Sequence, residues 1–274
     1  MRKSIQEINE LFGVEKPIIG MVHLKPLPGS PIYTGKGLKE VIESGLEDAR
    51  TLLEGGVDGI EIENYGDLSY FPNVAPSETV ASLSIVAHEI RKAFPKAVMG
   101  ICVLSDPIAS LSIAHCVQAQ FVRATFFTEA SVDVSGLVLR KPHEILRFRK
   151  FLDPSIKIFA DVHIKHSAPL ARRPIEESAY DAAYFLADAV IISGKHTGFE
   201  TDIEDLKKAK GVLSHFPVFI GSGLNQKNAL NLLNVADGAI VGTSLKVEGE
   251  TENPVDLKRV KELMEVVKAI RNKK

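Results

Sequence analysis

The chain has 274 residues, with 33 basic and 35 acidic side chains, and its formal net charge is −2 at pH 7. This near-neutral balance excludes a strong overall attraction for nucleic acid or for an anionic membrane surface. Hydrophobic residues make up 45% of the chain and charged residues 25%, which is typical of a globular protein and argues against disorder. The expected partners are therefore small molecules or other proteins, including further copies of this chain.

The cysteine content and the apolar runs predict a cytoplasmic protein. Cys102 and Cys116 lie in apolar stretches and lack the C-x-x-C spacing of metal or redox motifs, so no disulfide framework is expected. The first residues carry scattered charges and lack the apolar core of a secretory signal. Nowhere do about 18 uninterrupted apolar residues occur, so we expect no integral membrane contact.

Short runs rich in Val, Ile and Phe alternate along the chain with longer segments of helical periodicity, which is typical of a parallel sheet covered by helices. Eight candidate strands begin near residues 17, 57, 97, 120, 156, 188, 217 and 237. Helical patterns between them include residues 38–53, 77–94, 174–186, 225–235 and 256–270. Eight strand–helix units in one chain of this length predict a single-domain (β/α)8 barrel, or TIM barrel, over residues 1–274.

An acidic residue followed by a small one opens three of the predicted strands, at Asp58-Gly59, Asp188-Ala189 and Asp237-Gly238. This recurring pair is compatible with an internal repeat, and equally with similar loop sequences that arose without common descent.

Three long irregular segments, residues 25–37, 65–76 and 125–141, each follow a predicted strand. In a barrel this is the face that carries the active site. The third segment contains Gly136 and Arg140, and it can serve either as a lid over a phosphorylated ligand or as a packing loop.

Two glycine-containing turns predict a phosphate site. Glycine lets backbone N–H groups approach an anion, and barrels most often hold phosphate in the loops after strands seven and eight. The predicted phosphate-binding residues in these two loops are Gly221, Ser222, Gly223, Gly242, Thr243 and Ser244.

The fifth predicted strand carries three ionisable residues on one face. Because side chains alternate along a strand, Asp161, His163 and Lys165 are expected to point into the barrel. Such groups are costly to bury without partners or a function, and the structural alternative is an ion-pair network.

The second strand repeats this pattern, with Glu61 and Glu63 facing inward and Asn64 at the rim. Glu61 is expected to pair with Lys165 or Arg123, or to carry a raised pKa as a proton carrier. By the same alternation His23 points inward. The full candidate sets are Asp161, Lys165, His163, Glu61, Glu63 and His23 for catalysis, and Asn64, Arg123, Arg140, Ser193 and Gly194 for substrate binding.

Imidazole and carboxylate groups also suit a divalent cation such as zinc, manganese or iron. His23, Glu61, Glu63, Asp161 and His163 are the candidate ligands, although spacing alone does not bring them to one point. Cys102 is interpreted as a core residue, because no base can be assigned to it.

The long motifs resemble those of the BtpA/SgcQ family. The matching segments are IGMVHLKPLPGSP at residues 19–31, GIEIENYGD at 59–67, ADVHIKH at 160–166, GSG at 221–223 and DGAIVGTSLK at 237–246. One departure follows the third strand, where the family usually has an Asn-Asp pair and this chain has Ser105-Asp106. The lid segment matches loosely.

The resemblance implies a barrel similar to the ribulose-phosphate-binding barrels. The family takes its name from a role in the biogenesis or stability of photosystem I, and a relative is encoded among sugar-metabolism genes. Because members also occur where no photosystem exists, the resemblance implies an underlying metabolic activity, to which no reaction is firmly assigned.

The expected function is an enzyme that acts on a phosphorylated sugar or nucleotide-like molecule by acid–base chemistry of the isomerase, epimerase or lyase type. In this hypothesis Asp161 and Glu61 transfer protons, while Lys165 and His163 stabilise negative charge. The alternatives are a non-catalytic assembly or stability factor and a metal-dependent hydrolase.

Overall fold

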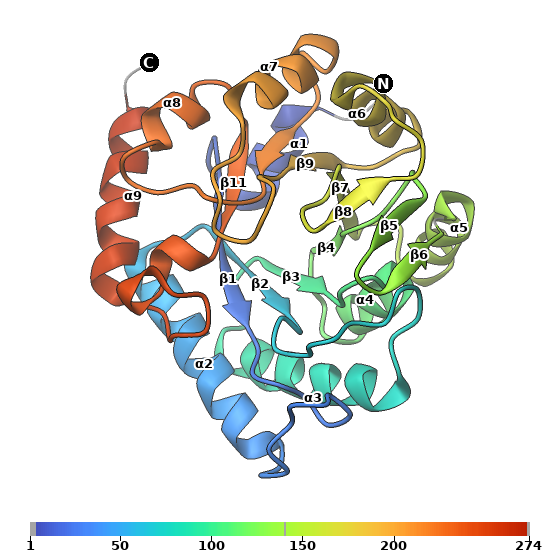
Figure 1. The fold of residues 1–274 in the computed structure, drawn as a ribbon. Coiled ribbons are helices and arrows are strands. Elements are labelled where there is room, and N and C mark those ends of the chain that lie inside the picture. The colour runs from blue at the N-terminus through green and yellow to red at the C-terminus, as the bar shows by residue number, and fades with distance from the viewer. Residues whose placement is uncertain (1–3, 140, 273–274) are drawn as a thin grey trace.

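Eight parallel strands close into a barrel in the computed structural model, which describes residues 4–139 and 141–272 (Figure 1). Each barrel strand pairs with the next barrel strand along the chain, and the last pairs with the first. The strands are β1 (Ile18–His23), β2 (Gly59–Glu63), β3 (Met99–Cys102), β4 (Phe121–Ala124), β7 (Lys157–Val162), β9 (Ala189–Ile192), β10 (Val218–Ile220) and β11 (Gly238–Val241). The predicted (β/α)8 barrel is confirmed.

Helices form a ring around the barrel (Figure 1). They are α2 (Leu38–Gly55), α3 (Ser77–Ala93), α4 (Pro107–Cys116), α5 (Pro142–Leu152), α6 (Ile175–Tyr184), α7 (Ile203–Val212), α8 (Ala229–Leu233) and α9 (Leu257–Arg271), with short 3₁₀ turns η1 (Thr243–Leu245) and η2 (Val247–Gly249). Helix α8 is shorter than predicted. Its first residues form a turn instead, because the Asn225 and Asn228 side chains accept hydrogen bonds from nearby backbone N–H groups. None of the helices in the described residues is both long and apolar enough to span a membrane.

The half of the barrel interior nearer the amino-terminal ends of the strands is apolar. The Phe121 ring stacks on Phe159 with ring centres 4.8 Å apart, and Phe159 meets Phe219 at 5.1 Å. Helix α1 (Ile5–Phe12) closes this end, since the Phe12 ring lies within 2.7 Å of where a Cβ on Gly59 would be. The inward-facing polar residues are therefore confined to the opposite end of the barrel.

Residues 125–139 are more ordered than the sequence suggested. They contain a hairpin of β5 (Ser131–Asp133) and β6 (Gly136–Val138), and β5 also pairs with β8 (Ser167–Pro169), which follows β7 (Figure 1). Val138 packs with Phe126 and Ile164 beneath this small sheet. Arg140, one of the predicted substrate-binding residues, lies outside the described residues.

Candidate active site

Arg123 on β4 is the centre of a buried charged cluster at the carboxyl end of the barrel. Its Nε and NH2 donate hydrogen bonds to the two carboxylate oxygens of Asp161 on β7, at 2.7 and 2.9 Å. Its NH1 lies 3.7 Å from Glu61 Oε1 and 3.8 Å from Glu63 Oε2, both on β2. Strand alternation therefore brings four of the predicted site residues together at one point.

Glu61 is completely buried, and neither carboxylate oxygen has a hydrogen-bond partner among the described residues. The 3.7 Å separation from Arg123 is too long for a hydrogen bond. Burial raises the pKa of Glu61 to about 8, and the positive charge of Arg123 offsets this only in part. Glu61 is therefore protonated at neutral pH, as one of the sequence alternatives proposed.

Although burial opposes its charge, the neighbouring carboxylates raise the pKa of Arg123, with Asp161 the strongest of them. The guanidinium therefore remains charged. Asp161 also accepts a hydrogen bond from Ser193 Oγ at 3.3 Å, so both of its oxygens are occupied. In this geometry Asp161 fixes the orientation of Arg123, which leaves it poorly placed to accept a substrate proton.

His23 lies beside this cluster at the end of β1. Its Nε2 is 3.9 Å from Glu63 Oε1, and its ring packs against Tyr65 with centres 4.6 Å apart. Burial lowers the pKa of His23 well below its usual value, and the positive charges of Lys246, Lys165 and Arg123 add to this effect. The imidazole is therefore neutral near pH 7, and its Nδ1 has no hydrogen-bond partner in the described part of the chain.

Cys102, interpreted from sequence as a core residue, faces into the barrel beside the two glutamates. One ligand atom each from Glu61, Glu63 and Cys102 lie within 4.8 Å of one another, so these three residues could hold a metal ion. This differs from the predicted ligand set, because Asp161 is bound to Arg123. The inward orientation of Cys102 could have been predicted from strand alternation. Gly100, two residues earlier, faces inward against the Phe121 ring, so Cys102 faces inward too.

A cavity of about 360 Å³ opens above the cluster, and Glu63, Arg123 and Lys165 line it. The Lys165 ammonium has no hydrogen-bond or ion-pair partner among the described residues. Burial lowers the pKa of Lys165, with a further contribution from Arg123. A molecule in this cavity would thus meet Glu63, Arg123 and Lys165 together, with the Asp133 carboxylate elsewhere on the lining.

The predicted inward orientation of His163 is wrong. His163 has a φ of +48° and His166 one of +62°, so the chain turns after β7 and strand alternation ends. The His163 ring is 3.1 Å from Ser178 Oγ on α6 and 3.7 Å from Glu129. It does not line the cavity that Arg123 and Lys165 share.

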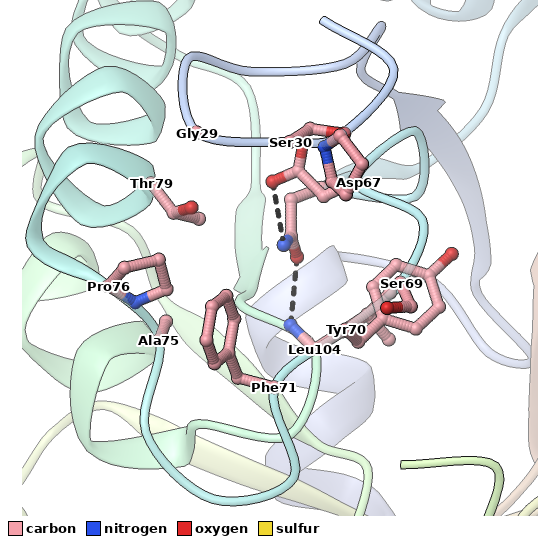
Figure 2. A pocket seen from close by; sticks show the side chains of 12 residues that line it. Gly29, Ser30, Asp67, Ser69, Tyr70, Phe71, Ala75, Pro76, Thr79 and Leu104 are labelled. Atoms are coloured by element: carbon pink, nitrogen blue, oxygen red, sulfur yellow. Dashed lines mark hydrogen bonds between the residues drawn. The ribbon is translucent and has the colours of Figure 1, made fainter.

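Asn64 is also placed differently from the expectation of a residue that contacts substrate. Its side-chain oxygen accepts a hydrogen bond from the Leu104 backbone at 2.8 Å, and its nitrogen donates to Asp67 at 3.2 Å (Figure 2). Asp67 in turn accepts from the Leu27 backbone. These hydrogen bonds connect the loops after β1, β2 and β3. Asn64 also lines a separate small cavity of about 20 Å³.

Ser105-Asp106, the departure from the family pattern, has a structural role in this chain. Asp106 accepts hydrogen bonds from the Ile108 and Ala109 backbone at the start of α4, and also from the Ala75 backbone. The Ser105 N–H donates to Thr125 Oγ1 at 3.2 Å. These bonds fix the loop after β3 against its neighbours.

The two glycine turns lie beside the charged cluster. A Cβ on Gly242 would be 2.8 Å from the His23 ring, and one on Gly221 would be 2.3 Å from Ser193 Oγ. Ser244 Oγ donates to the Leu224 carbonyl at 2.6 Å, which joins the two turns. Among the described residues, no acceptor is bonded to the backbone N–H groups of Thr243 and Ser244.

The first of these turns is covered by residues 196–200, called here the cover segment. A Cβ on Gly223 would lie 2.4 Å from the Phe199 carbonyl oxygen, and one on Gly194 would lie 2.5 Å from the same atom. Ser222 Oγ accepts from the Gly194 N–H at 2.7 Å and donates to the Phe199 carbonyl at 3.0 Å. In this structure these glycines allow close backbone packing, and Ser222 is occupied by the chain itself.

The cover segment is attached to the loop after β7 through His166. His166 Nε2 accepts a hydrogen bond from the Thr197 N–H at 3.3 Å and lies 3.2 Å from Thr197 Oγ1. His166 Nδ1 is 3.4 Å from Nδ1 of His196. These contacts hold the start of the cover segment, while Ser222 and the close packing on Gly194 and Gly223 hold its other end.

The BtpA family model matches residues 14–269 of the chain. The chain is 44% identical to an uncharacterized protein of Thermococcus kodakarensis over 93% of this chain and 97% of that protein. It is 35% identical to the photosystem I biogenesis protein BtpA of Synechocystis sp., over 95% of this chain and 91% of that protein.

Two solved structures with the same fold are those of thiamine phosphate pyrophosphorylase from Pyrococcus furiosus and phosphoribosyl anthranilate isomerase from Thermus thermophilus. The first has a TM-score of 0.56 and 19% identity, and covers 93% of this chain and 96% of its own. The second has a TM-score of 0.57 and 12% identity, and covers 93% and 100%.

Proposed function

The chain belongs to the BtpA family, and we propose that it is an enzyme that acts on a phosphorylated small molecule by acid–base chemistry at the mouth of its barrel. The observation that carries this proposal is the joint placement of Glu63, Arg123 and Lys165 on one cavity of about 360 Å³. A carboxylate and two cations on one shared concave surface suit proton transfer at a carbon or hydroxyl, as in isomerases, epimerases and lyases.

Arg123 and Lys165 stabilise the negative charge that develops on the substrate. Arg123 is held in place by Asp161, so it does not reorganise during the reaction. Lys165 has no protein partner among the described residues and can bind an oxygen of the substrate directly. Its lowered pKa also makes it suitable for giving up or taking a proton.

Glu63 is the proton acceptor in this proposal, because its carboxylate lines the cavity and lies 3.8 Å from Arg123. Glu61 lies below it and keeps its proton at neutral pH, so it does not add a second negative charge to the base of the site. Asp161 acts through Arg123 as a positioning residue. His163, which contacts Ser178, has no part in this mechanism.

The substrate phosphate binds at the turn after β11, where the Thr243 and Ser244 N–H groups begin η1. Backbone N–H groups of this kind bind phosphate in many barrels. Gly242 places this turn against His23, next to Glu63. The cover segment has to move for the phosphate to reach Gly223, and phosphate binding energy would then orient the reacting carbon.

A thermal-shift screen of phosphate esters tests this proposal. A ligand at one hundred times its Kd adds about 2.7 kcal/mol to the stability of the folded state. We expect phosphosugars or nucleotide-like esters to stabilise the protein, and Lys165→Met to abolish this shift. Lys195→Met is the control, since Lys195 is an exposed lysine of the neighbouring loop. The proposal fails if no phosphate ester stabilises the protein, or if both variants respond alike.

A second candidate function is that of an assembly factor, in line with the name of the Synechocystis relative. The observation that favours it is the exposed apolar surface of the small sheet, with Val132 and Leu137 paired across β5 and β6 and Leu139 beside them. The two functions separate in cells that depend on this protein. Lys165→Met should remove an enzymatic function, whereas Val132→Ser with Leu137→Ser should remove an assembly function.

A further inference from the structure

We infer that the part of the substrate remote from the phosphate is a flat apolar ring system, and that a hydroxyl-rich sugar chain does not fill the cavity. This inference rests on the proposed function and specifies its substrate class. The observation behind it is a separation within the cavity: Glu63, Arg123 and Lys165 lie together, while the rest of the lining offers apolar surface and polar side chains, most of which have protein partners.

Aliphatic and aromatic side chains supply a large part of the walls. The walls come from five segments: the loops after β2, β3, β7 and β9, and residues 125–135. The apolar and aromatic wall residues are Tyr65, Leu68, Tyr70, Leu104, Phe126, Val134 and Ile164. A planar apolar ring bound between such side chains removes surface from water on both of its faces.

The tyrosine hydroxyls of these walls already have hydrogen-bond partners in the protein. Tyr70 OH donates to the Tyr65 carbonyl at 2.5 Å, and Tyr65 OH lies 3.4 Å from Glu252. Both rings therefore present carbon atoms to the cavity while their polar ends are bound to protein.

Several smaller polar groups of the walls also have protein partners. Ser135 Oγ donates to the Tyr70 carbonyl at 2.9 Å, and Asp133 Oδ1 accepts from the Ser135 N–H at 2.7 Å. Thr125 Oγ1 accepts from the Ser105 N–H, and Thr197 is bound to His166. A row of sugar hydroxyls would lose its water partners here and find few replacements.

Two large apolar side chains at the rim are exposed to solvent. Leu68 is 53% exposed and Val134 is 88% exposed, and both line the same cavity from different loops. Exposed apolar side chains around a concave site are typical of a surface that a ligand covers. A ring that enters with its apolar edge outward would contact both side chains.

Calorimetric titration with two matched phosphate monoesters tests this inference. The probes are benzyl phosphate, which carries an aromatic ring, and ribose 5-phosphate, which carries hydroxyls at similar size and charge. We expect benzyl phosphate to bind at least tenfold more tightly. Val134→Ser and Leu68→Ser should each reduce this preference several-fold, while both variants keep the fold because these side chains are exposed.

Leu137→Ser is the matched control, because Leu137 is exposed on β6 but does not line the cavity. It should leave both affinities unchanged. Equal or tighter binding of ribose 5-phosphate would overturn the inference about the ring and leave the proposed function standing. A preference that survives in both Val134→Ser and Leu68→Ser would overturn it too. If neither ester binds and inorganic phosphate gives no heat, the proposed function fails, and this inference fails with it.

Discussion

A single guanidinium connects the strands that carry the candidate chemistry. Arg123 joins β4 to β7 through Asp161 and lies within 4 Å of both glutamates of β2. Breaking a buried pair by removing one partner costs more than the pair contributes, because a buried charge is left uncompensated. The geometry of the mouth is therefore most sensitive to changes at Arg123 and Asp161.

We expect Asp161→Asn to lower turnover of the substrate found in the ester screen by about 10²-fold or more, because Arg123 loses the charge that orients it. The fold should survive, since asparagine keeps the size of the side chain and Arg123 retains both glutamates as neighbours. Turnover assays and circular dichroism check the two parts. Full activity in this variant would remove Asp161 from the mechanism.

Glu61→Gln gives a prediction about pH. The pKa of Glu61 is raised from 4.5 to about 8, so the folded state binds more protons than the unfolded state between these values. The stability of the wild-type protein should therefore fall, relative to Glu61→Gln, as the pH rises from 4.5 to 8. One pKa unit corresponds to about 1.4 kcal/mol, which gives an upper bound of roughly 5 kcal/mol.

Urea unfolding of both proteins at pH 5 and pH 8 measures this difference. The titration of His23 affects the unfolding free energy of both proteins, so its contribution cancels when the two are compared. A difference in unfolding free energy that stays constant with pH would show that Glu61 is ionised throughout this range.

Among single residues, the sequence was informative wherever a strand stayed regular. Alternation placed Glu61, Glu63 and Asp161 in the barrel, and the structure has them there. It failed at His163, because a positive φ ends the alternation and no residue type marks that turn in advance. Asn64 was misplaced for another reason: whether an amide binds protein or substrate depends on loops that meet only in the folded chain.

At the scale of the elements, the three acidic residues that open strands share one set of contacts. Asp58, Asp188 and Asp237 each accept a hydrogen bond from a backbone N–H at the start of the neighbouring strand, at 2.8 to 2.9 Å. Each also pairs with a basic side chain, which is Arg271, Arg149 or Lys210. The recurring sequence pair thus has a physical cause, because it joins adjacent strands at the amino-terminal end of the barrel.

Asp188→Ala tests this role. The substitution leaves the Ile158 N–H and the Arg149 guanidinium without their acceptor, so we expect it to reduce stability by about 3 kcal/mol. Ligand affinity should not change, since Asp188 lies at the end of the barrel opposite the cavity. Chemical unfolding measures the effect, and Glu144→Ala, at an exposed helical residue, should cost less than about 0.5 kcal/mol. A similar cost for both variants would contradict the proposed role.

Strand and helix positions were predictable because buried parallel strands and amphipathic helices leave strong local patterns. The hairpin of β5 and β6 was not, since its strands have three residues each and one partner, β8, lies more than thirty residues away. The position of the cover segment was not predictable from the sequence either. Gly221 and Gly223 suggested an open anion site, and only the folded chain shows Phe199 and Glu200 against Gly223.

For the molecule as a whole, the two ends of the barrel have different roles: one contributes apolar packing to stability, and the other carries the candidate chemistry. Three phenylalanines in mutual contact and α1 fill one end with apolar contacts, while the charges are gathered at the other. Such a division lets the hydrophobic end support costly buried charges at the mouth. It also means that stability and ligand binding should respond to different substitutions.

Phe12→Ala examines this division at the closed end. Phe12 packs against Phe121 with ring centres 6.0 Å apart and fills the space beside Gly59. Truncating a buried phenylalanine costs about 3–5 kcal/mol through lost burial and the cavity left behind, and we expect a loss of this size in chemical unfolding. The affinity for phosphate esters should stay within about twofold, because distant, independent sites contribute additively. A large loss of affinity in a folded Phe12→Ala protein would show that the two ends are coupled, since packing strain would then reach Arg123 through Phe121 on the same strand.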